Sequence, residues 1–539
     1  MQGVQKALRT WSSGLTSSIK TQTSLCLHWL NWLDIAEEGR ALSILECKLR
    51  PLLKGRYEEL CLQEEIKWRQ RSKVQWIRAG DANTKFFHMR ANGRRNKNFI
   101  SRIMDGDAVL STPGSISDHL SSFFRIHLGV QQTDPDLIID LHFLYRDDNI
   151  DLSNLLSAFS MEEVKEAISS SAPEKSPGPD GFPMMFYLRF WATLKDDIME
   201  VFNRFHSDSV DLKEINTSWV CPIPKKPDVV SVRDLRPISL IHGLAKIISK
   251  VLAKRLQCFM ARLINPHQTA FIKGRNILDS FFTAHILVHH LQSSKSQATI
   301  FKIDFERAFD HINWNFLLAI LRARGFDHLW ISWISNLLHS SSTAVLFNRI
   351  PGTSFSCKRG LRQGDPLSPL LFILCVDVLF RMLQLAVNSH LLPAIGIGEA
   401  KIHTLQFADD ILIFFDGSSR SAAVIKVILD AFSSSSGLKI NFNKSSLIPI
   451  NLSSEQTRLL TNVFACPIQD FPIKYLGLPL SPKRLRKSDY LALIEKIDNR
   501  LAGWKGNLLL RGVDSFLSIR YSLLSLPIFV QLTCSPLGS

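Results

Sequence analysis

The chain lacks the features that mark zinc-binding and secreted proteins. Its nine cysteines are scattered over 539 residues, and none forms a C-x₂-C pair or a C-x₂-C…H-x-H pattern, so no zinc site is predicted. This scatter favours free thiols in a reducing compartment. The first twenty residues are polar and rich in Ser and Thr, which excludes a signal peptide there. The chain also contains no internal repeat.

Long uninterrupted apolar segments are absent as well. The longest run, Leu367 to Phe380, contains Asp377 and Pro369 and is predicted to be too short to span a bilayer, so we expect no membrane contact. What the chain does have is 45% hydrophobic residues, enough for a large core and two or more domains. Its net charge of +15 and pI of about 9.4 are typical of nucleic-acid binding, although basic proteins also bind membranes or acidic partners.

Two adjacent carboxylates, Asp409 and Asp410, interrupt an apolar stretch that runs from Leu405 to Phe414. Asp favours turns, whereas Ile, Leu and Phe favour strands, so the pattern predicts two strands joined by a tight turn. Two unpaired carboxylates beside such flanks would suppress each other's ionisation, and a bound divalent cation removes that cost. A solvated hairpin tip is the alternative.

A second stretch, Phe301 to Asp310, predicts a short strand that runs into a helix, with Asp304 where the strand would end. A fold that brings the two strands together would place Asp304 beside the Asp409–Asp410 pair. Three carboxylates can hold two Mg²⁺ ions, of which one activates a hydroxyl and the other holds phosphates.

The N-terminal third has less specific patterns. Residues 1 to about 105 are predicted to be mostly helical, with leucines at roughly helical spacing that Pro51 interrupts. From Trp68 to Lys97, basic residues alternate with aromatic ones, which suits the phosphates and bases of a nucleic-acid strand; a solvated helix end with core aromatics is the alternative. Residues 106–160 predict a linker with some helix.

Several segments downstream can be assigned local structure. Lys175 to Phe182 contains two prolines and two glycines, which exclude a helix interior and predict a turn. The helix predicted over 244–263 presents three lysines on one face, suited to a phosphate backbone or to solvent: Lys246, Lys250 and Lys254. Asn313 is expected to cap a helix that ends before Gly325.

The segment Lys358 to Leu370 predicts a loop ahead of a helix. Glycines at 360 and 364 permit close backbone approach to a ligand. Ser368 can cap, and Pro369 can open, a helix over 370–385.

In this order the segments resemble the motifs of reverse transcriptases of the LINE type, that is, of non-LTR retrotransposons. Lys175–Phe182 resembles the SPGPDG loop ahead of the fingers, and the numbered and lettered motifs follow: motif 1 (Ile223–Leu240), 2 (Ile264–Ile277), A (Phe301–Asp310), B (Lys358–Leu370), C (Leu405–Phe414), D (Ser436–Ser445) and E (Lys474–Leu480). Gly80 to His88 resembles the segment that plant elements carry upstream of their polymerase.

The resemblance implies an α+β, right-hand polymerase fold with an antiparallel-sheet palm and helical fingers and thumb. The implied domains are a basic helical extension (1–105), a linker and the start of the fingers (106–174), the reverse transcriptase domain (175–480) and a helical thumb-like tail (481–539). Apolar residues at helical spacing from Leu493 to Trp504 agree with the last of these.

The resemblance also implies a role for each matching residue. Asp304, Asp409 and Asp410 would hold two Mg²⁺ ions, with Mn²⁺ as a substitute, and Lys444 would protonate the pyrophosphate leaving group as a general acid. Four residues would lie at the incoming nucleotide: Lys225, Arg236, Gln363 and Phe309, the last as the steric gate that excludes a 2′-hydroxyl; for Phe309 a core position is the alternative. Three would lie by the template: Gln268, Lys273 and Arg275.

The partners implied are an RNA template, a DNA primer and deoxynucleoside triphosphates, and the location implied is the nucleus or a cytoplasmic ribonucleoprotein. Neither the endonuclease nor the Cys/His or ribonuclease H module of full-length elements is visible, so we expect a fragment of a longer reading frame. The alternatives are a decayed or domesticated copy that binds RNA without polymerising, and an intron-encoded maturase-like reverse transcriptase.

Overall fold

The computed structural model describes residues 19–72, 95–130, 138–148, 150–226, 229–397, 400–491 and 493–495, together with a few single positions before residue 95. Its chain divides into two compact units. Unit 1 comprises residues 1–274, 305–389 and 425–441, and unit 2 comprises residues 275–304, 390–424 and 442–539. Helix α17 (Ser419–Ser436) begins in unit 2 and ends in unit 1.

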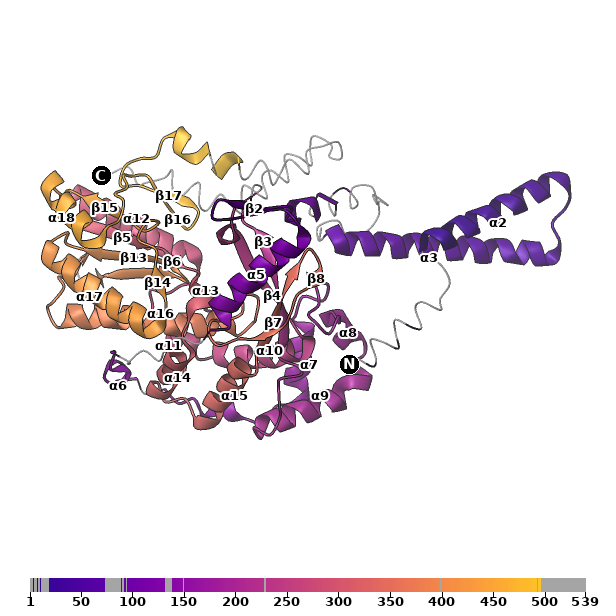
Figure 1. The fold of residues 1–539 in the computed structure, drawn as a ribbon, viewed down its shortest axis with the longest axis horizontal. Helices are drawn as coiled ribbons and strands as arrows, with labels where there is room; N and C mark the ends of the chain where they lie inside the picture. Colours follow the sequence, from indigo (N-terminus) through magenta and orange to yellow (C-terminus); the bar gives the residue numbers. More distant parts are fainter. Residues whose placement is uncertain are drawn as a thin grey trace, which may run out of the picture. The chain divides into compact units, whose positions relative to one another are not determined.

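Unit 2 is built on a four-stranded antiparallel sheet in the order β12-β13-β5-β15 (Figure 1). Its strands are β5 (Ala298–Ile303), β12 (Thr404–Phe407), β13 (Asp410–Phe415) and β15 (Ser446–Ile450). Strands β5 and β13 are central and almost entirely buried, which explains why their sequences are continuous apolar runs. The strand–turn–strand predicted around Asp409 and Asp410 is confirmed.

Helix α12 (Ile277–Ser293) and the hairpin of β16 (Ile473–Tyr475) and β17 (Leu478–Leu480) share a hydrophobic core with this sheet. The core includes Phe281 and Leu287 of α12, Leu412 of β13 and Tyr475 of β16. The remaining elements of unit 2 are small or peripheral: β10 (Gly396–Ile397), β11 (Ala400–Lys401), α18 (Ser454–Phe464) and η3 (Lys487–Tyr490). An antiparallel sheet with one apolar face covered therefore carries the acidic turn.

Unit 1 contains a five-stranded sheet, which the prediction of helical fingers did not include. Its order is β4-β3-β7-β8, with β9 also paired to β7, and β3 and β7 run parallel. The strands are β3 (Thr217–Pro224), β4 (Leu235–Ile241), β7 (Ser342–Phe347), β8 (Ile350–Pro351) and β9 (Phe355–Ser356). Strand β3 alternates half-buried and buried residues, as a sheet with one packed face does. Tertiary pairing across more than 100 residues forms this sheet.

Helices make up most of the rest of unit 1: α7 (Met161–Ser169), α8 (Met184–Arg189), α9 (Trp191–His206), α10 (Gly243–Gln257), α11 (Met260–Leu263), α13 (Ala308–His311), α14 (Trp314–Ala323), α15 (His328–His339) and α16 (Ser368–Asn388). Short elements complete it: α6 (Leu141–Leu144), η1 (Ser153–Leu156), η2 (Val232–Asp234), β6 (Phe305–Glu306) and β14 (Lys439–Ile440). Asn313 caps α14 as predicted, because its side chain accepts from the N–H groups of Asn315 and Phe316.

Helix α16 differs from its prediction in two respects. Ser368 does not cap it; Ser368 is the first helical residue, and the Asp365 carboxylate accepts from the Leu367 N–H (2.8 Å) instead. The run was also predicted to be too short to span a membrane, which was wrong because the helix continues to Asn388. In the described part of the chain, α16 is the one helix that is long and apolar enough to cross a membrane, by length and composition only. Of its most apolar stretch, 72% is buried inside the protein, as in a core helix.

The described part of the N-terminal region is mostly helical, as predicted for residues 1 to about 105. Helices α2 (Ile19–Gly39) and α3 (Ile44–Ser72) form an antiparallel hairpin (Figure 1). Pro51 was predicted to interrupt the helical pattern, but α3 continues through it, although a proline removes one helical hydrogen bond and its ring crowds the preceding turn. The predicted linker contains β1 (Ile103–Asp105), β2 (Ala108–Leu110) and α5 (Pro113–Leu128), and α5 buries Phe124 in a core with the sheet of unit 1. The segment Gly80–His88 and most of the predicted thumb helix lie outside the described residues.

Candidate active site

Three predicted metal ligands lie at the same end of the central strands of unit 2. Phe407 and Asp410 are the last pair of the β12–β13 hairpin, so Asp409 sits in its two-residue turn. Ala408, the other turn residue, has φ +55°, the left-handed conformation that tight hairpin turns require. Ile411 pairs with Ile303 of β5, and Asp304 follows Ile303 directly. The register therefore brings Asp304 beside Asp410, and all three carboxylates are exposed.

The electrostatics of this end of the sheet favour a cation. Desolvation, and then the neighbouring charges of Asp410 and Asp304, raise the pKa of Asp409 above its usual range. Carboxylate oxygens are the ligands that Mg²⁺ and Mn²⁺ prefer, so the donor set fits such ions. In the described parts of the chain, no three acidic, His or Cys side chains already stand close enough to chelate an ion. The side chains would have to converge upon binding.

Lys444 lies near the same end of the sheet. It is exposed and occupies the turn between β14 and β15. The next residue, Ser445, is buried, and its hydroxyl accepts from the Asp304 N–H (3.1 Å). Behind the acidic residues, the Lys302 ammonium donates to the Lys474 carbonyl of β16 (2.7 Å), which ties the motif E hairpin to β5. Asp304, Asp409, Asp410 and Lys444 thus share one region of unit 2.

A second group of predicted site residues gathers in unit 1 around the loop 358–367. The Gln363 carbonyl accepts from the Ser239 N–H of β4 (2.8 Å), and the Gln363 amide donates to the Asp310 carboxylate (3.4 Å). The Leu361 N–H donates to the Phe309 carbonyl (2.6 Å). Hydrogen bonds between the loop 358–367 and residues 309 and 310 therefore hold Gln363 near Phe309.

Phe309 is half-buried, and its ring stacks on the fully buried Phe372 of α16, with centroids 4.4 Å apart and an interplanar angle of 13°. One face of the ring is thus fixed by the core. This position is compatible with both predicted roles of Phe309, the steric gate and a core residue. Gly360 has φ +79°, and a Cβ there would lie 2.6 Å from the Asp310 carbonyl oxygen. The close approach predicted for this glycine is to the chain's own backbone, not to a ligand.

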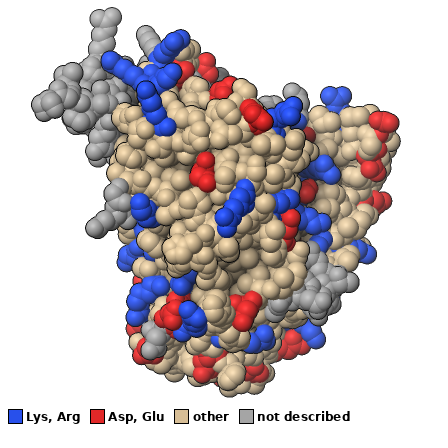
Figure 2. Space-filling model, turned by 90° about the vertical axis from the view of Figure 1, so that its left-hand side faces the viewer, with Lys and Arg blue, Asp and Glu red and all other residues tan. Residues whose placement is uncertain are grey.

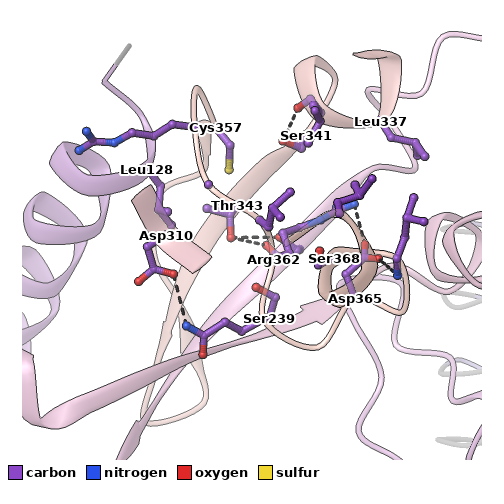
Figure 3. A pocket seen from close by; sticks show the side chains of 18 of the residues that line it. Leu128, Ser239, Asp310, Leu337, Ser341, Thr343, Cys357, Arg362, Asp365 and Ser368 are labelled. Atoms are coloured by element: carbon purple, nitrogen blue, oxygen red, sulfur yellow. Dashed lines mark hydrogen bonds and ion pairs between the residues drawn. The ribbon is translucent and has the colours of Figure 1, made fainter. Parts of the chain in front are cut away.

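Beneath the loop lies a cavity of about 50 Å³ (Figure 3), which has room for roughly three or four water molecules. Asp310 lines it and is almost fully buried, and burial raises the pKa of its carboxyl to about 6 although Arg307 and Gln363 oppose the shift. On the other side, the Arg362 guanidinium donates to Asn216 (2.6 Å) and Asp365 (3.2 Å). These contacts make the loop a rigid element.

Lys225 and Arg236 lie on the β3–β4 hairpin of the same unit. Arg236 is exposed and pairs across the strands with Ile223, and Lys225 is exposed two residues further along β3's direction. The Lys225 ammonium donates to the Arg233 carbonyl (2.9 Å). Its positive charge, like that of Arg307, opposes the rise in the pKa of Asp310 that burial causes. The structure therefore brings all four predicted nucleotide-binding residues into one neighbourhood of unit 1.

The three predicted template residues have different environments. Lys273 is exposed and Arg275 is half-exposed, as a phosphate contact requires. Gln268, by contrast, is completely buried, and its side-chain oxygen accepts from the Ala270 N–H (3.0 Å). A direct template contact by Gln268 is excluded in this conformation, because the polar side chain satisfies its own loop. On α10, Lys254 pairs with Glu166 (2.8 Å) rather than facing a free surface.

The SPGPDG loop has a structural role that its residues did not predict. The Asp180 side chain is fully buried and accepts from the Gly243 N–H (3.0 Å) at the start of α10 and from the Tyr187 hydroxyl (2.9 Å). Gly178 packs on the backbone of Ile241, where a Cβ would come within 2.3 Å of the carbonyl oxygen. The loop therefore seats the N-terminus of α10 at the end of β4.

We expect Asp180→Ala to destabilise unit 1 by about 2–3 kcal/mol, since it removes two hydrogen bonds to a buried charged acceptor and leaves the Gly243 N–H unsatisfied. Denaturant unfolding would measure this. Tyr187→Phe, which removes one of the two bonds, is the matched control and should cost less. Equal stability of Asp180→Ala and the wild-type protein would contradict this capping role.

Two residues of this region were missed in the sequence. Asp310 and Arg307 form a buried ion pair (3.6 Å) beside Gln363, and Arg307 has φ +46°. Asp310 ends the motif A stretch and lies in α13, so its only signal was a charged residue that follows the apolar Ala308 and Phe309. A single sequence cannot separate such a buried carboxylate from a solvated one.

The surface shows how the basic charge is distributed. On the face drawn in Figure 2, Lys and Arg side chains are interspersed with Asp and Glu and separated by wide uncharged areas. The net charge of +15 is therefore not gathered into one patch on that face.

Comparison with known proteins connects this geometry to a family. Residues 223–480 match the family model described as reverse transcriptase (RNA-dependent DNA polymerase). The chain is 26% identical over 446 residues to the transposon TX1 uncharacterized 149 kDa protein of Xenopus laevis, covering 81% of this chain and 33% of that protein. It is 27% identical over 299 residues to the Pol polyprotein of retrotransposable element R2 of Popillia japonica, covering 54% and 39%.

A third relative is the Pol polyprotein of element R2DM of Drosophila melanogaster, 26% identical over 343 residues, which are 63% of this chain and 30% of that one. The chain thus spans about a third of the length of these relatives, and all three come from animals. Both groups of site residues, including the three carboxylates and Gln363, fall within the matched region.

Proposed function

We propose that this chain, whose residues 223–480 form a reverse transcriptase domain of the non-LTR retrotransposon type, is an RNA-directed DNA polymerase. The observation that carries the proposal is the placement of Asp304 beside Asp409 and Asp410 at the end of two central antiparallel strands. Its substrates are an RNA template, a DNA primer and deoxynucleoside triphosphates. Reverse transcriptases generally use divalent metal ions.

The chemistry is phosphoryl transfer, in which positioning and charge neutralisation supply most of the catalysis. Asp304, Asp409 and Asp410 would hold two Mg²⁺ ions, or Mn²⁺ in their place, and the bound ions would supply activation of the primer hydroxyl and neutralisation of the triphosphate charge. The primer 3′-hydroxyl attacks the α-phosphate of the nucleotide in line, and pyrophosphate leaves. Lys444 donates a proton to that leaving group as the general acid.

The residues of unit 1 bind and select the nucleotide. Arg236 and Lys225 are exposed cations that neutralise the triphosphate. Phe309, held on one face by Phe372, presents its other face as a wall against a 2′-hydroxyl. Gln363, on a loop anchored to β4, orients the nucleotide.

The finer assignments belong to the same proposal. The four-stranded sheet of unit 2 is the centre of the palm, and unit 1 supplies the fingers. The resemblance of Gly80–His88 supports an affiliation with plant elements, and the location proposed is the nucleus or a cytoplasmic ribonucleoprotein.

Primer extension tests the proposal. The purified chain is incubated with a poly(rA)/oligo(dT) template and primer, dTTP and Mg²⁺, beside the double variant Asp409→Asn/Asp410→Asn. We expect extension by the wild-type chain alone. Salt-sensitive RNA binding without extension by either protein would support instead a copy that binds RNA without polymerising. Equal extension by both would overturn the assignment of the metal site.

A further inference from the structure

We propose that a buried relay, running from the ion pair Arg324–Asp377 through Asn265 to Gln268, holds the motif 2 loop (264–277) in the conformation that receives the template. In this relay Gln268 and Asn265 are positioning residues, and Lys273 is the contact. The inference rests on the proposed function, because it assigns the loop to the template of that reaction. All residues of the relay, and Lys273, belong to unit 1.

The relay begins at an ion pair in the core. Arg324, at the end of α14, and Asp377, in the middle of α16, both have fully buried side chains, and the guanidinium donates to the carboxylate. Arg324 also lies over the ring of Tyr145, 4.2 Å from its centroid. Arg381 and Asp148 complete a neutral group of two cations and two anions, with Arg381 3.1 Å from Asp148. The charges are thus fixed from several sides.

Both members of the ion pair also bind the start of the loop. The Arg324 guanidinium donates to the carbonyl of Leu263, the last residue of α11. Asp377 accepts twice from Asn265, from its backbone N–H (3.0 Å) and from its side-chain amide (2.8 Å). Because hydrogen bonds to a buried charge are about twice as strong as neutral ones, the loop is attached to the core at its first residues.

The side chains of the loop then continue the relay. The Asn265 side-chain oxygen accepts from the N–H groups of His267 (3.0 Å) and Gln268 (3.1 Å). The buried Gln268 oxygen accepts from the Ala270 N–H (3.0 Å). From α10, the Gln257 amide, in the orientation that satisfies both groups, bonds the Phe271 carbonyl (3.1 Å) and the Lys273 N–H (3.0 Å). Backbone groups at five of the residues from His267 to Lys273 are therefore anchored.

What these anchors present is a short exposed segment. Phe271 has φ +60°, a strained conformation for a bulky residue, and 48% of its surface is exposed. Lys273, two residues later, is also exposed, whereas Ala270 and Ile272 are buried. Strain of this kind persists only where the surroundings impose it. A loop held in advance in its binding conformation loses less entropy when a nucleic-acid strand binds.

A purely structural role of the ion pair is the competing explanation. Removing one partner of any buried pair destabilises a protein, whatever the pair positions. The two explanations differ in what they predict for residues of the same charge group that do not contact the loop. Asp148 is such a residue, since its ion-pair partners among the described residues are Arg324 (3.9 Å) and Arg381 (3.1 Å).

The test compares Asn265→Asp with Asp148→Asn in the full chain. Asn265→Asp keeps the acceptor for His267 and Gln268 but replaces the donor to Asp377 by a second carboxylate. We expect its KM for poly(rA)/oligo(dT), and its Kd for a fluorescent single-stranded RNA, to rise about tenfold, with the KM for dTTP within about twofold of wild type. Asp148→Asn should lower stability while leaving the template KM unchanged.

A swapped pair gives a rescue. In Asn265→Asp/Asp377→Asn the amide and the carboxylate exchange places, so one donor and one acceptor again face each other and the total charge is kept. We expect the double variant to recover only part of the RNA affinity, because Arg324 and Arg381 then face an amide in place of the Asp377 carboxylate. Amide hydrogen exchange gives an independent readout, because the relay predicts faster exchange at His267, Gln268 and Ala270 in Asn265→Asp.

The outcomes separate the relay from the polymerase proposal. Equal losses of RNA affinity in Asp148→Asn and Asn265→Asp would overturn the relay, as would unchanged exchange in the loop. Faster exchange in Asn265→Asp with unchanged RNA affinity would show that the relay orders the loop but that the loop does not receive the template. This result would also overturn the inference. A wild-type chain that binds RNA without extending a primer would overturn the polymerase alone, and the RNA affinities of the variants would still decide the relay.

Discussion

Asp410→Asn is expected to slow primer extension by on the order of a thousandfold. Asp410 opens β13 beside Asp304, so the substitution removes a negatively charged ligand from the centre of the proposed metal site. Single-turnover extension at saturating dTTP would measure the loss, because it reports chemistry separately from product release. Asp304→Asn should have an effect of similar size.

The same substitutions should not destabilise the protein. Desolvation, and then the neighbouring charges of Asp410 and Asp304, raise the pKa of Asp409. The repulsion among the three carboxylates therefore costs stability at pH values above that raised pKa, where all three are ionised. An amide at position 304 or 410 reduces that repulsion, and stability at pH 7 should be unchanged or higher. Asp470→Asn, an exposed change in the same unit, is the matched control for both activity and stability. Extension by Asp410→Asn at the wild-type rate would refute the metal site.

Phe309→Val is expected to weaken the discrimination against ribonucleotides by on the order of a hundredfold, through the ratio of kcat/KM for dTTP and UTP. The ring is fixed on one face by Phe372, so it cannot move aside for a 2′-hydroxyl, whereas the smaller valine leaves room for one. The kcat/KM for dTTP should change much less than that for UTP, since a deoxyribose carries no 2′-hydroxyl that could meet the Phe309 ring.

A loss of core packing alone has a different signature. Phe347→Val removes a buried ring from the core around β7 in the same unit and should lower stability without changing sugar selection. If Phe309→Val lowered stability as Phe347→Val does and left the dTTP-to-UTP ratio unchanged, Phe309 would be a core residue and the gate assignment would fail.

The sequence alone determined the features that depend on neighbouring residues. The strand–turn–strand around Asp409 and Asp410, the cap at Asn313 and the non-helical loop 175–182 all follow from local preferences of Asp, Asn, Pro and Gly, and the structure agrees with each. The order of the motifs indicated reverse transcriptase, and the family match over 223–480 agrees. These features are local or ordered along the chain, so no knowledge of long-range packing was needed.

Only the tertiary structure decided which polar residues are available to a ligand. Gln268 was predicted at the template and is buried; Ser368 was predicted as a helix cap and is instead the buried first residue of α16. Asp180 seats a helix that begins 63 residues later. The physical reason is common to all three: a polar side chain can satisfy its hydrogen bonds with water, a ligand or a distant backbone group. Which of these it meets depends on the packing of segments far apart in the chain.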